Sequence, residues 1–162
     1  MSVNIFSKIL LKLIDTNVDS INSVSPKLVS RATAILPQST AGAIFTVSGR
    51  CFVSDIIGEV TTELGAGLNN MKLTCNPTVG ASVDLCAVKD VDTDAVGTLY
   101  NITGTLGDAL VATTSGAFES QSLPSVVTAG TIDLDCSASR AGSVKWVLFY
   151  IPIDAGATIV VT

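Results

Sequence analysis

The most informative part of this sequence is a nine-residue run near its end, Ser143-Val144-Lys145-Trp146-Val147-Leu148-Phe149-Tyr150-Ile151. Its β-branched and aromatic side chains favour a strand, and beyond Lys145 the residues on both faces of that strand are apolar. The run therefore predicts a central strand that is covered on both sides, or one that faces a partner subunit. Its composition is also typical of an aggregation-prone strand, so we expect it to be buried or paired in the native protein.

The neighbouring run 131–136 has the alternation of a half-buried strand, with Ile132, Leu134 and Cys136 on one face. From about Arg31 onward, other short runs rich in Val, Ile, Thr and Phe are separated by turn residues. About ten short strands at this spacing predict an all-β domain over residues 31–162, a β-sandwich or a jelly-roll-like fold. The expected strands are 32–36, 43–48, 50–63, 71–75, 83–88, 98–103, 109–113, 125–127, 131–137, 143–151 and 158–161.

The N-terminal region has a helical rather than a strand-like rhythm. Its apolar residues recur three and four apart, at Ile5, Phe6, Ile9, Leu10, Leu13, Ile14, Val18 and Ile21. This pattern predicts an amphipathic helix over residues 3–23, in an N-terminal arm of residues 1–30. Lys8 and Lys12 interrupt the apolar run, so we predict no signal peptide. Polar residues from Asp15 to Ser20 end the run too early for a span of about 20 residues, so we predict no transmembrane helix.

The sequence leaves three alternative locations for the predicted helix. It packs on its own domain, it docks on a neighbouring subunit or on copies of itself, or it lies on a membrane surface. The few basic residues on its polar face disfavour the membrane, and we predict no membrane partner. The candidate interface residues are Ile5, Phe6, Ile9, Leu10, Leu13 and Ile14 of the helix, with Trp146, Leu148 and Tyr150 of the last long strand.

The composition points toward an assembly. The chain has 162 residues, of which 48% are hydrophobic and only 14% are charged, with a net charge of −5. Such a chain is too apolar for disorder and too acidic for a generic nucleic-acid binder. With few charges to solvate its surface, we expect it to form a homo-oligomer or to be part of a larger assembly.

The residues that carry chemistry form no catalytic motif. Histidine is absent, which removes the Ser-His-Asp and Cys-His mechanisms and the commonest metal ligand. The acidic run 90–94 begins like a calcium loop but has Ala95 and Asn101 where the EF-hand needs Gly and Glu. We therefore predict that the protein is not an enzyme and holds no metal or cofactor. The four cysteines, which lie in strand-like apolar runs, are expected to be buried free thiols: Cys51, Cys75, Cys86 and Cys136.

Several segments of the chain stand out as characteristic phrases: RATAILP at 31–37, AIFTV at 43–47, DIIGEVTT at 55–62, KLTCNPT at 72–78, GTIDL at 130–134 and GSVKWVLFYIP at 142–152, which closes in DAGA at 154–157. In these segments the chain resembles a family of small virion structural proteins of tailed bacteriophages. The resemblance covers roughly residues 31–160, leaves out the predicted helix, and is most specific in the last segment.

The resemblance implies a non-enzymatic virion component that is assembled in the host cytoplasm. A compact β-domain with an anchoring arm suits a capsid decoration (cement) protein, which binds and stabilises the head shell. The same parts suit a head-fibre base or a tail accessory protein, and a carbohydrate- or receptor-binding module is a further alternative. The implied partners are the major capsid protein or other virion proteins, without direct sequence-specific binding of nucleic acid.

Overall fold

The computed structural model describes residues 25–162, and the regular secondary structure in this range consists of β-strands alone. The prediction of an all-β domain is thus confirmed, whereas the helix predicted over residues 3–23 lies outside the described residues. In residues 25–162 no helix is long and apolar enough to cross a bilayer. The strands are β1 (Lys27–Ile35), β2 (Ala41–Ser48), β3 (Cys51–Thr62), β4 (Asn70–Pro77), β5 (Val83–Asp84), β6 (Lys89–Asp90), β7 (Leu99–Asn101), β8 (Val111–Thr113), β9 (Ser125–Val127), β10 (Gly130–Cys136), β11 (Ser143–Pro152) and β12 (Thr158–Val161).

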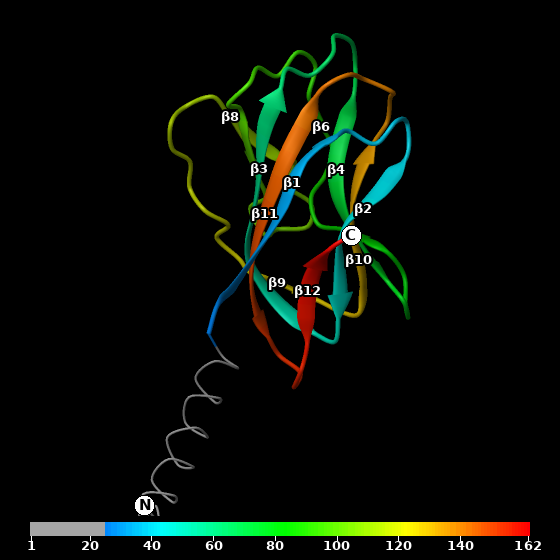
Figure 1. Cartoon of the computed structure of the whole chain (residues 1–162), viewed down its shortest axis with the longest axis vertical. Helices are drawn as coiled ribbons and strands as arrows, with labels where there is room; N and C mark the ends of the chain where they lie inside the picture. The colour runs from blue at the N-terminus through cyan, green and yellow to red at the C-terminus, as the bar shows by residue number, and fades with distance from the viewer. Residues whose placement is uncertain (1–24) are drawn as a thin grey trace, which may run out of the picture.

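The strands form two antiparallel sheets (Figure 1). Sheet A has the order β1-β11-β3-β7-β8, with β9 also paired to β3. Sheet B has the order β12-β2-β10-β4-β5, with β6 also paired to β4. The pairs are nested along the chain: β1 pairs with β11, β2 with β10, β3 with β7 and β4 with β5. The chain therefore runs like one long hairpin folded over on itself.

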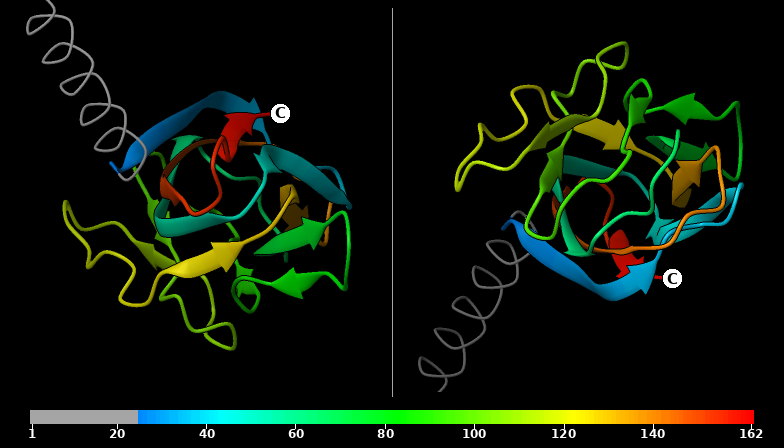
Figure 2. Two further views of the ribbon diagram at one scale, coloured as in Figure 1. Left: turned by 90° about the horizontal axis from the view of Figure 1, so that it is seen from below. Right: turned by 90° about the horizontal axis from the view of Figure 1, so that it is seen from above.

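The two sheets enclose a single hydrophobic core. Viewed along the strands, β1 and β12 lie beside each other at one side of the molecule (Figure 2). The bridge between Ala87 and Ala109 joins the sheets near the opposite side. The largest buried side chains include Phe45 of sheet B and Tyr100 and Trp146 of sheet A. The rings of Tyr100 and Trp146 stack with their centroids 6.4 Å apart.

The strand β11 is central in sheet A, because it lies between β1 and β3. Its even-numbered residues Val144 to Tyr150 are buried and its odd-numbered residues are half-buried, which is the alternation of a strand with one face on the core. Trp146 fits there because its register partner on β3 is Gly58. A Cβ atom at Gly58 would lie 2.8 Å from the Cζ3 and Cη2 atoms of the Trp146 ring.

Two boundaries differ from the sequence prediction. The strand β1 begins at Lys27 rather than Ala32, so residues 27–30, predicted as part of the arm, belong to sheet A through pairing with Val147–Tyr150. Of the strand predicted over 83–88, only Val83–Asp84 forms a strand, β5, and the next strand, β6, begins at Lys89. Buried Leu85 and Cys86 gave that segment its strand-like apolar pattern, but they enter the core from the connection between the strands.

Candidate interaction surface

The outward sides of the two sheets differ sharply in chemistry. On sheet A the outward side chains in the middle of the sheet are mainly apolar, and we call this set the apolar outer face. On sheet B the outward side chains are mainly polar or acidic, among them Thr46, Lys72, Thr74, Asp84, Thr131, Asp133 and Asp135. The apolar outer face consists of Leu28, Phe52, Ile57, Val126, Val147, Phe149 and Ile151.

Strand register assembles the apolar outer face from four strands. Ile151 of β11 pairs with Phe52 of β3, which in turn pairs with Val126 of β9, so three apolar side chains form a row across the sheet. A second row joins Leu28 to Phe149 and ends at Asp55 of β3, and a third joins Ser30 to Val147 and Ile57. Register partners share a face and their side chains are in contact range, so the rows form one continuous patch.

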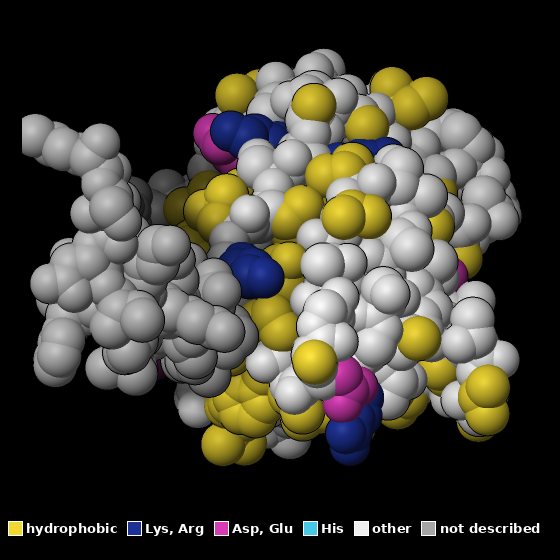
Figure 3. Space-filling model, turned by 60° about the horizontal axis from the view of Figure 1, so that its bottom comes forward, with side chains coloured by type: hydrophobic (Ala, Val, Ile, Leu, Met, Phe, Trp, Pro, Cys, Tyr) yellow, Lys and Arg dark blue, Asp and Glu magenta, His cyan; other side chains and the backbone are white. Residues whose placement is uncertain are grey.

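The patch remains partly accessible to solvent within the described residues. Leu28 is 58% exposed and Val126 is 56% exposed, while the other members are half-buried. Figure 3 shows hydrophobic side chains in several groups on one side of the molecule, with a few charged side chains between them. Contiguous exposed apolar patches often mark interaction sites, whereas single apolar residues scattered over a surface are common and carry no such meaning. The apolar outer face is therefore the candidate docking surface of the domain.

A loop limits this face on its β7 side. Residues 114–124 connect β8 to β9, and the Glu119 carbonyl accepts a hydrogen bond of 3.1 Å from Asn101 Nδ2. The Gln121 side chain is buried and donates to the Leu123 carbonyl at 2.6 Å. The loop thus shields the outer side of β7 and leaves the face over β1, β11 and the start of β3 uncovered by it.

Several charged groups on the outer side of sheet B are paired with one another. The Lys72 ammonium donates to the Asp84 carboxylate at 2.8 Å and lies 3.9 Å from Asp135. The hydrogen bond to Asp84 raises the pKa of Lys72, and the same bond lowers the pKa of Asp84. These paired groups need no further partner, whereas Asp133 Oδ1 on the same side is buried and has no hydrogen-bond partner among the described residues.

The structure places the sequence-predicted interface residues in two different regions. Trp146, Leu148 and Tyr150 point into the core between the sheets, and Trp146 and Leu148 have no exposed surface. This corrects the interface prediction for these three residues, because a single chain already buries them. The predicted interface residues of the helix, from Ile5 to Ile14, lie outside the described residues.

The acidic segment 90–94 has a structural use. Among the described residues, no group of three His, Cys, Asp or Glu side chains is placed to hold a metal ion. Each carboxylate of this segment instead holds a neighbouring segment in place: Asp90 accepts a hydrogen bond from the Asn69 amide at 3.0 Å, Asp92 from the Gly67 amide at 2.7 Å and Asp94 from the Tyr100 hydroxyl at 2.6 Å. Burial of Tyr100, followed by its hydrogen bond to Asp94, raises the pKa of the Tyr100 hydroxyl.

All four cysteines are free and buried, as predicted. Burial raises the pKa of the Cys86 thiol to about 11 and that of Cys136 to about 12. Burial likewise raises the pKa of Cys51 and of Cys75. Because the thiolate is the nucleophile, these thiols act as small apolar core residues at neutral pH.

Comparison of the chain with family models, with curated proteins and with solved structures found no match.

Proposed function

We propose that this chain is a non-enzymatic structural component of a tailed-phage virion, a capsid decoration protein that binds and stabilises the head shell. The observation that carries the proposal is the apolar outer face of sheet A, set against a polar outer side on sheet B. A domain with one apolar side is built to bury that side against a neighbour. The resemblance of residues 31–160 to virion proteins supplies the class of neighbour.

The nested strand order supports a jelly roll as the finer description of the fold. In a jelly roll early strands pair with late ones and the pairing continues inward, as β1 with β11, β2 with β10, β3 with β7 and β4 with β5 do here. The last strand, β12, pairs with β2. Jelly rolls occur in viral capsid domains, in lectin domains and in cupins. The fold therefore fits a virion protein, although the surface rather than the fold carries the functional argument.

The N-terminal arm enters the domain at the rim of the apolar outer face. The edge strand β1 begins at Lys27, and its next residue, Leu28, is a member of that face. An amphipathic helix over residues 3–23, as the sequence predicts, would immediately precede this edge strand in the chain. We therefore propose that the arm and the apolar outer face together form the docking surface for the shell, with a homo-oligomer as the bound form.

Quantitative mass spectrometry of purified virions tests this function. Heads and tails are separated and the copies of this chain are counted relative to the major capsid protein. The proposal expects the chain in the head fraction in multiple copies per capsomer ring. Absence from the particles, or presence in the tail fraction only, would overturn the capsid assignment.

A further inference from the structure

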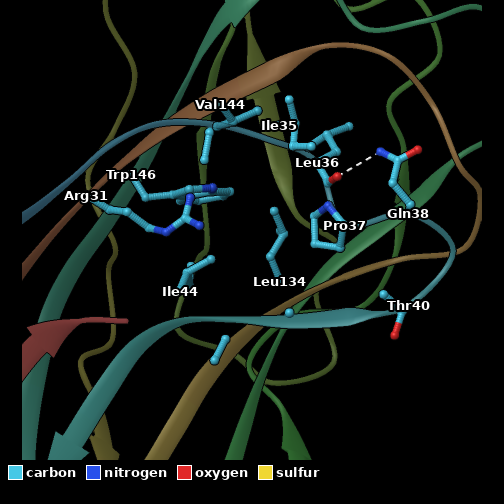
Figure 4. Close-up of a pocket in the computed structure, with 13 residues that line it drawn as sticks. Arg31, Ile35, Leu36, Pro37, Gln38, Thr40, Ile44, Leu134, Val144 and Trp146 are labelled. Carbon is cyan, nitrogen blue, oxygen red and sulfur yellow. Dashed lines mark hydrogen bonds between the residues drawn. The ribbon is translucent and has the colours of Figure 1, made fainter.

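A cavity of about 320 Å³ opens between β1 of sheet A and β2 of sheet B, on the side of the molecule away from β8. Figure 4 shows Trp146 and Arg31 at one end of it, Leu36 and Pro37 at the other, and Ile44 and Leu134 along one wall. Most of the lining is apolar. For scale, an apolar cavity of about 150 Å³ in another protein is large enough to bind benzene. This cavity therefore has room for an apolar body of roughly twice that size.

The indole N–H of Trp146 is buried at one end of this cavity and has no partner. Trp146 is fully buried, yet its Nε1 finds no acceptor within the described part of the chain. The ring edge that carries Cε3, Cζ3 and Cη2 lies against Gly58 of β3. Because β11 lies between β3 and β1, the opposite edge with Nε1 is directed toward β1 and the cavity. A buried donor that lacks an acceptor costs free energy, and a ligand with an acceptor oxygen recovers that cost.

Arg31 adds a positive charge beside that donor. It is the register partner of Trp146 on β1, so the two side chains lie next to each other on the same face of the sheet. Across residues 25–162, its guanidinium has neither a hydrogen bond nor an ion pair. The described residues that line the cavity include no acidic side chain, although the chain as a whole carries 14 Asp and Glu.

The other side-chain donors at the cavity are already engaged. Gln38 Nε2 donates to the carbonyl of Leu36 at 2.8 Å and to that of Arg140 at 3.1 Å. The Thr40 hydroxyl donates to the carbonyl of Ala41 at 3.3 Å. The side-chain donors left for a ligand are therefore the Trp146 N–H and the Arg31 guanidinium, both of which require an acceptor.

We propose that this cavity binds an organic carboxylate with an apolar body. The carboxylate would accept hydrogen bonds from the Arg31 guanidinium and, once the side chains over the indole shift, from the buried Trp146 N–H. The apolar body would fill the space toward Leu36, Ile44 and Leu134. Charge-assisted hydrogen bonds of this kind are the stronger class, so the charged head provides selectivity while the apolar wall provides contact area. This site is separate from the proposed docking surface, because it opens between the sheets rather than on the outer face of sheet A.

The single tryptophan of the chain makes the test specific. Trp146 is the only tryptophan, so its fluorescence and its one indole N–H signal in a proton–nitrogen spectrum both report on the cavity. Full-length protein is titrated with octanoate, below its micelle concentration, and with octanol and octylamine as matched head-group controls. We expect saturable binding of octanoate with a shifted indole N–H signal, octanol weaker by roughly tenfold or more, and no binding of octylamine.

Variants separate the carboxylate contact from simple apolar binding. Arg31→Gln should lower the affinity for octanoate by roughly tenfold and leave the affinity for octanol unchanged. Lys27→Gln removes the same charge from the same strand outside the cavity and should change neither affinity. Equal binding of octanoate and octanol, unchanged octanoate affinity in Arg31→Gln, or no response of the Trp146 signals to any acid would each overturn the proposal.

A further arm identifies the source of the carboxylate. N-acetyl-leucine carries the carboxylate of a polypeptide end, and N-acetyl-leucinamide is its neutral control. Tighter binding of N-acetyl-leucine than of octanoate supports a polypeptide terminus as the ligand, and the reverse order supports a free aliphatic acid. Binding of N-acetyl-leucinamide as tight as that of N-acetyl-leucine would contradict a site built for a carboxylate.

Discussion

Trp146 decides which side of β11 faces the core. Its ring stacks on Tyr100 and lies over Gly58, so the core has space for it only where β3 carries no side chain. With Trp146 turned inward, the alternation of the strand sends Val147 and Phe149 outward. A glycine on one strand thereby determines which apolar residues of the next strand reach the surface.

Adding a methyl group at this contact should be costly. We expect Gly58→Ala to lower the free energy of unfolding by about 1–3 kcal/mol, because its Cβ atom would overlap the Trp146 ring. Urea unfolding measured by circular dichroism checks this. Gly107→Ala is the control, since nothing lies within 4 Å of a Cβ atom there and the loss should be small. Equal losses in the two variants would show that the Trp146 contact is not tight.

The buried thiols should make the protein lose stability in alkali. The pKa of Cys86 is about 11 in the folded chain, against about 8.5 for an unfolded cysteine. Between these values the unfolded state releases the proton first, so the free energy of unfolding falls as the pH rises from about 9 to 11. Cys136 acts in the same direction, since burial raises its pKa as well.

Cys86→Ala isolates one thiol in this pH dependence. The variant should be less stable at pH 7 because a buried side chain is truncated. Its stability should nevertheless fall less steeply above about pH 9, by up to about 1.4 kcal/mol per pH unit. Urea unfolding in reductant at a series of pH values measures both effects. A slope identical to that of the parent chain would show that Cys86 does not titrate on unfolding.

At the scale of elements, sequence pattern predicted the strands better than it predicted their faces. The alternation of residues 131–136 and the apolar run at 143–151 located β10 and β11 correctly. In β11 both faces are apolar, so periodicity alone could not distinguish the core side from the outer side, and Trp146 was assigned to an interface. The answer depended on the register with Gly58, a residue far away in sequence.

The apolar outer face should respond to a charge placed at its centre. Phe149→Lys keeps the strand and places the new ammonium near Asp55, the register partner on β3. We expect the variant to remain folded but to lose binding to emptied phage heads by tenfold or more, as for a central interface residue. Co-sedimentation with heads measures this loss.

Thr131→Lys is the matched control for this variant. It adds the same charge to the outward side of β10 at the centre of sheet B, opposite Thr46 and Asn76. Binding to heads should be retained. If Thr131→Lys abolished binding while Phe149→Lys retained it, the docking surface would lie on sheet B instead.

The arm should be separable from the domain. The described core cluster is built from residues between Leu36 and Ile159, and β1 pairs with β11 from Lys27 onward. A chain that lacks residues 1–24 should therefore fold but oligomerise or dock less well. Thermal unfolding and analytical ultracentrifugation measure the two properties. Loss of cooperative unfolding in the shortened chain would instead place the helix in the core of its own domain.

At the scale of the whole molecule, the low charge content is distributed unevenly. Paired charges such as Lys72 and Asp84 lie on the outward side of sheet B, while the middle of sheet A presents Phe149 and its neighbours. Composition predicted a chain with surface to cover, but it could not locate that surface. The location follows from the three-dimensional register of four strands, which a linear pattern does not contain.

A reconstruction of the phage particle by cryo-electron microscopy at side-chain resolution tests the central claim most directly. The proposal predicts density for the β-domain on the head shell, with Phe149, Ile151 and Phe52 of the apolar outer face buried against a neighbouring subunit. Density in which sheet A faces solvent while the outward side of sheet B, around Asp133, contacts the shell would contradict it.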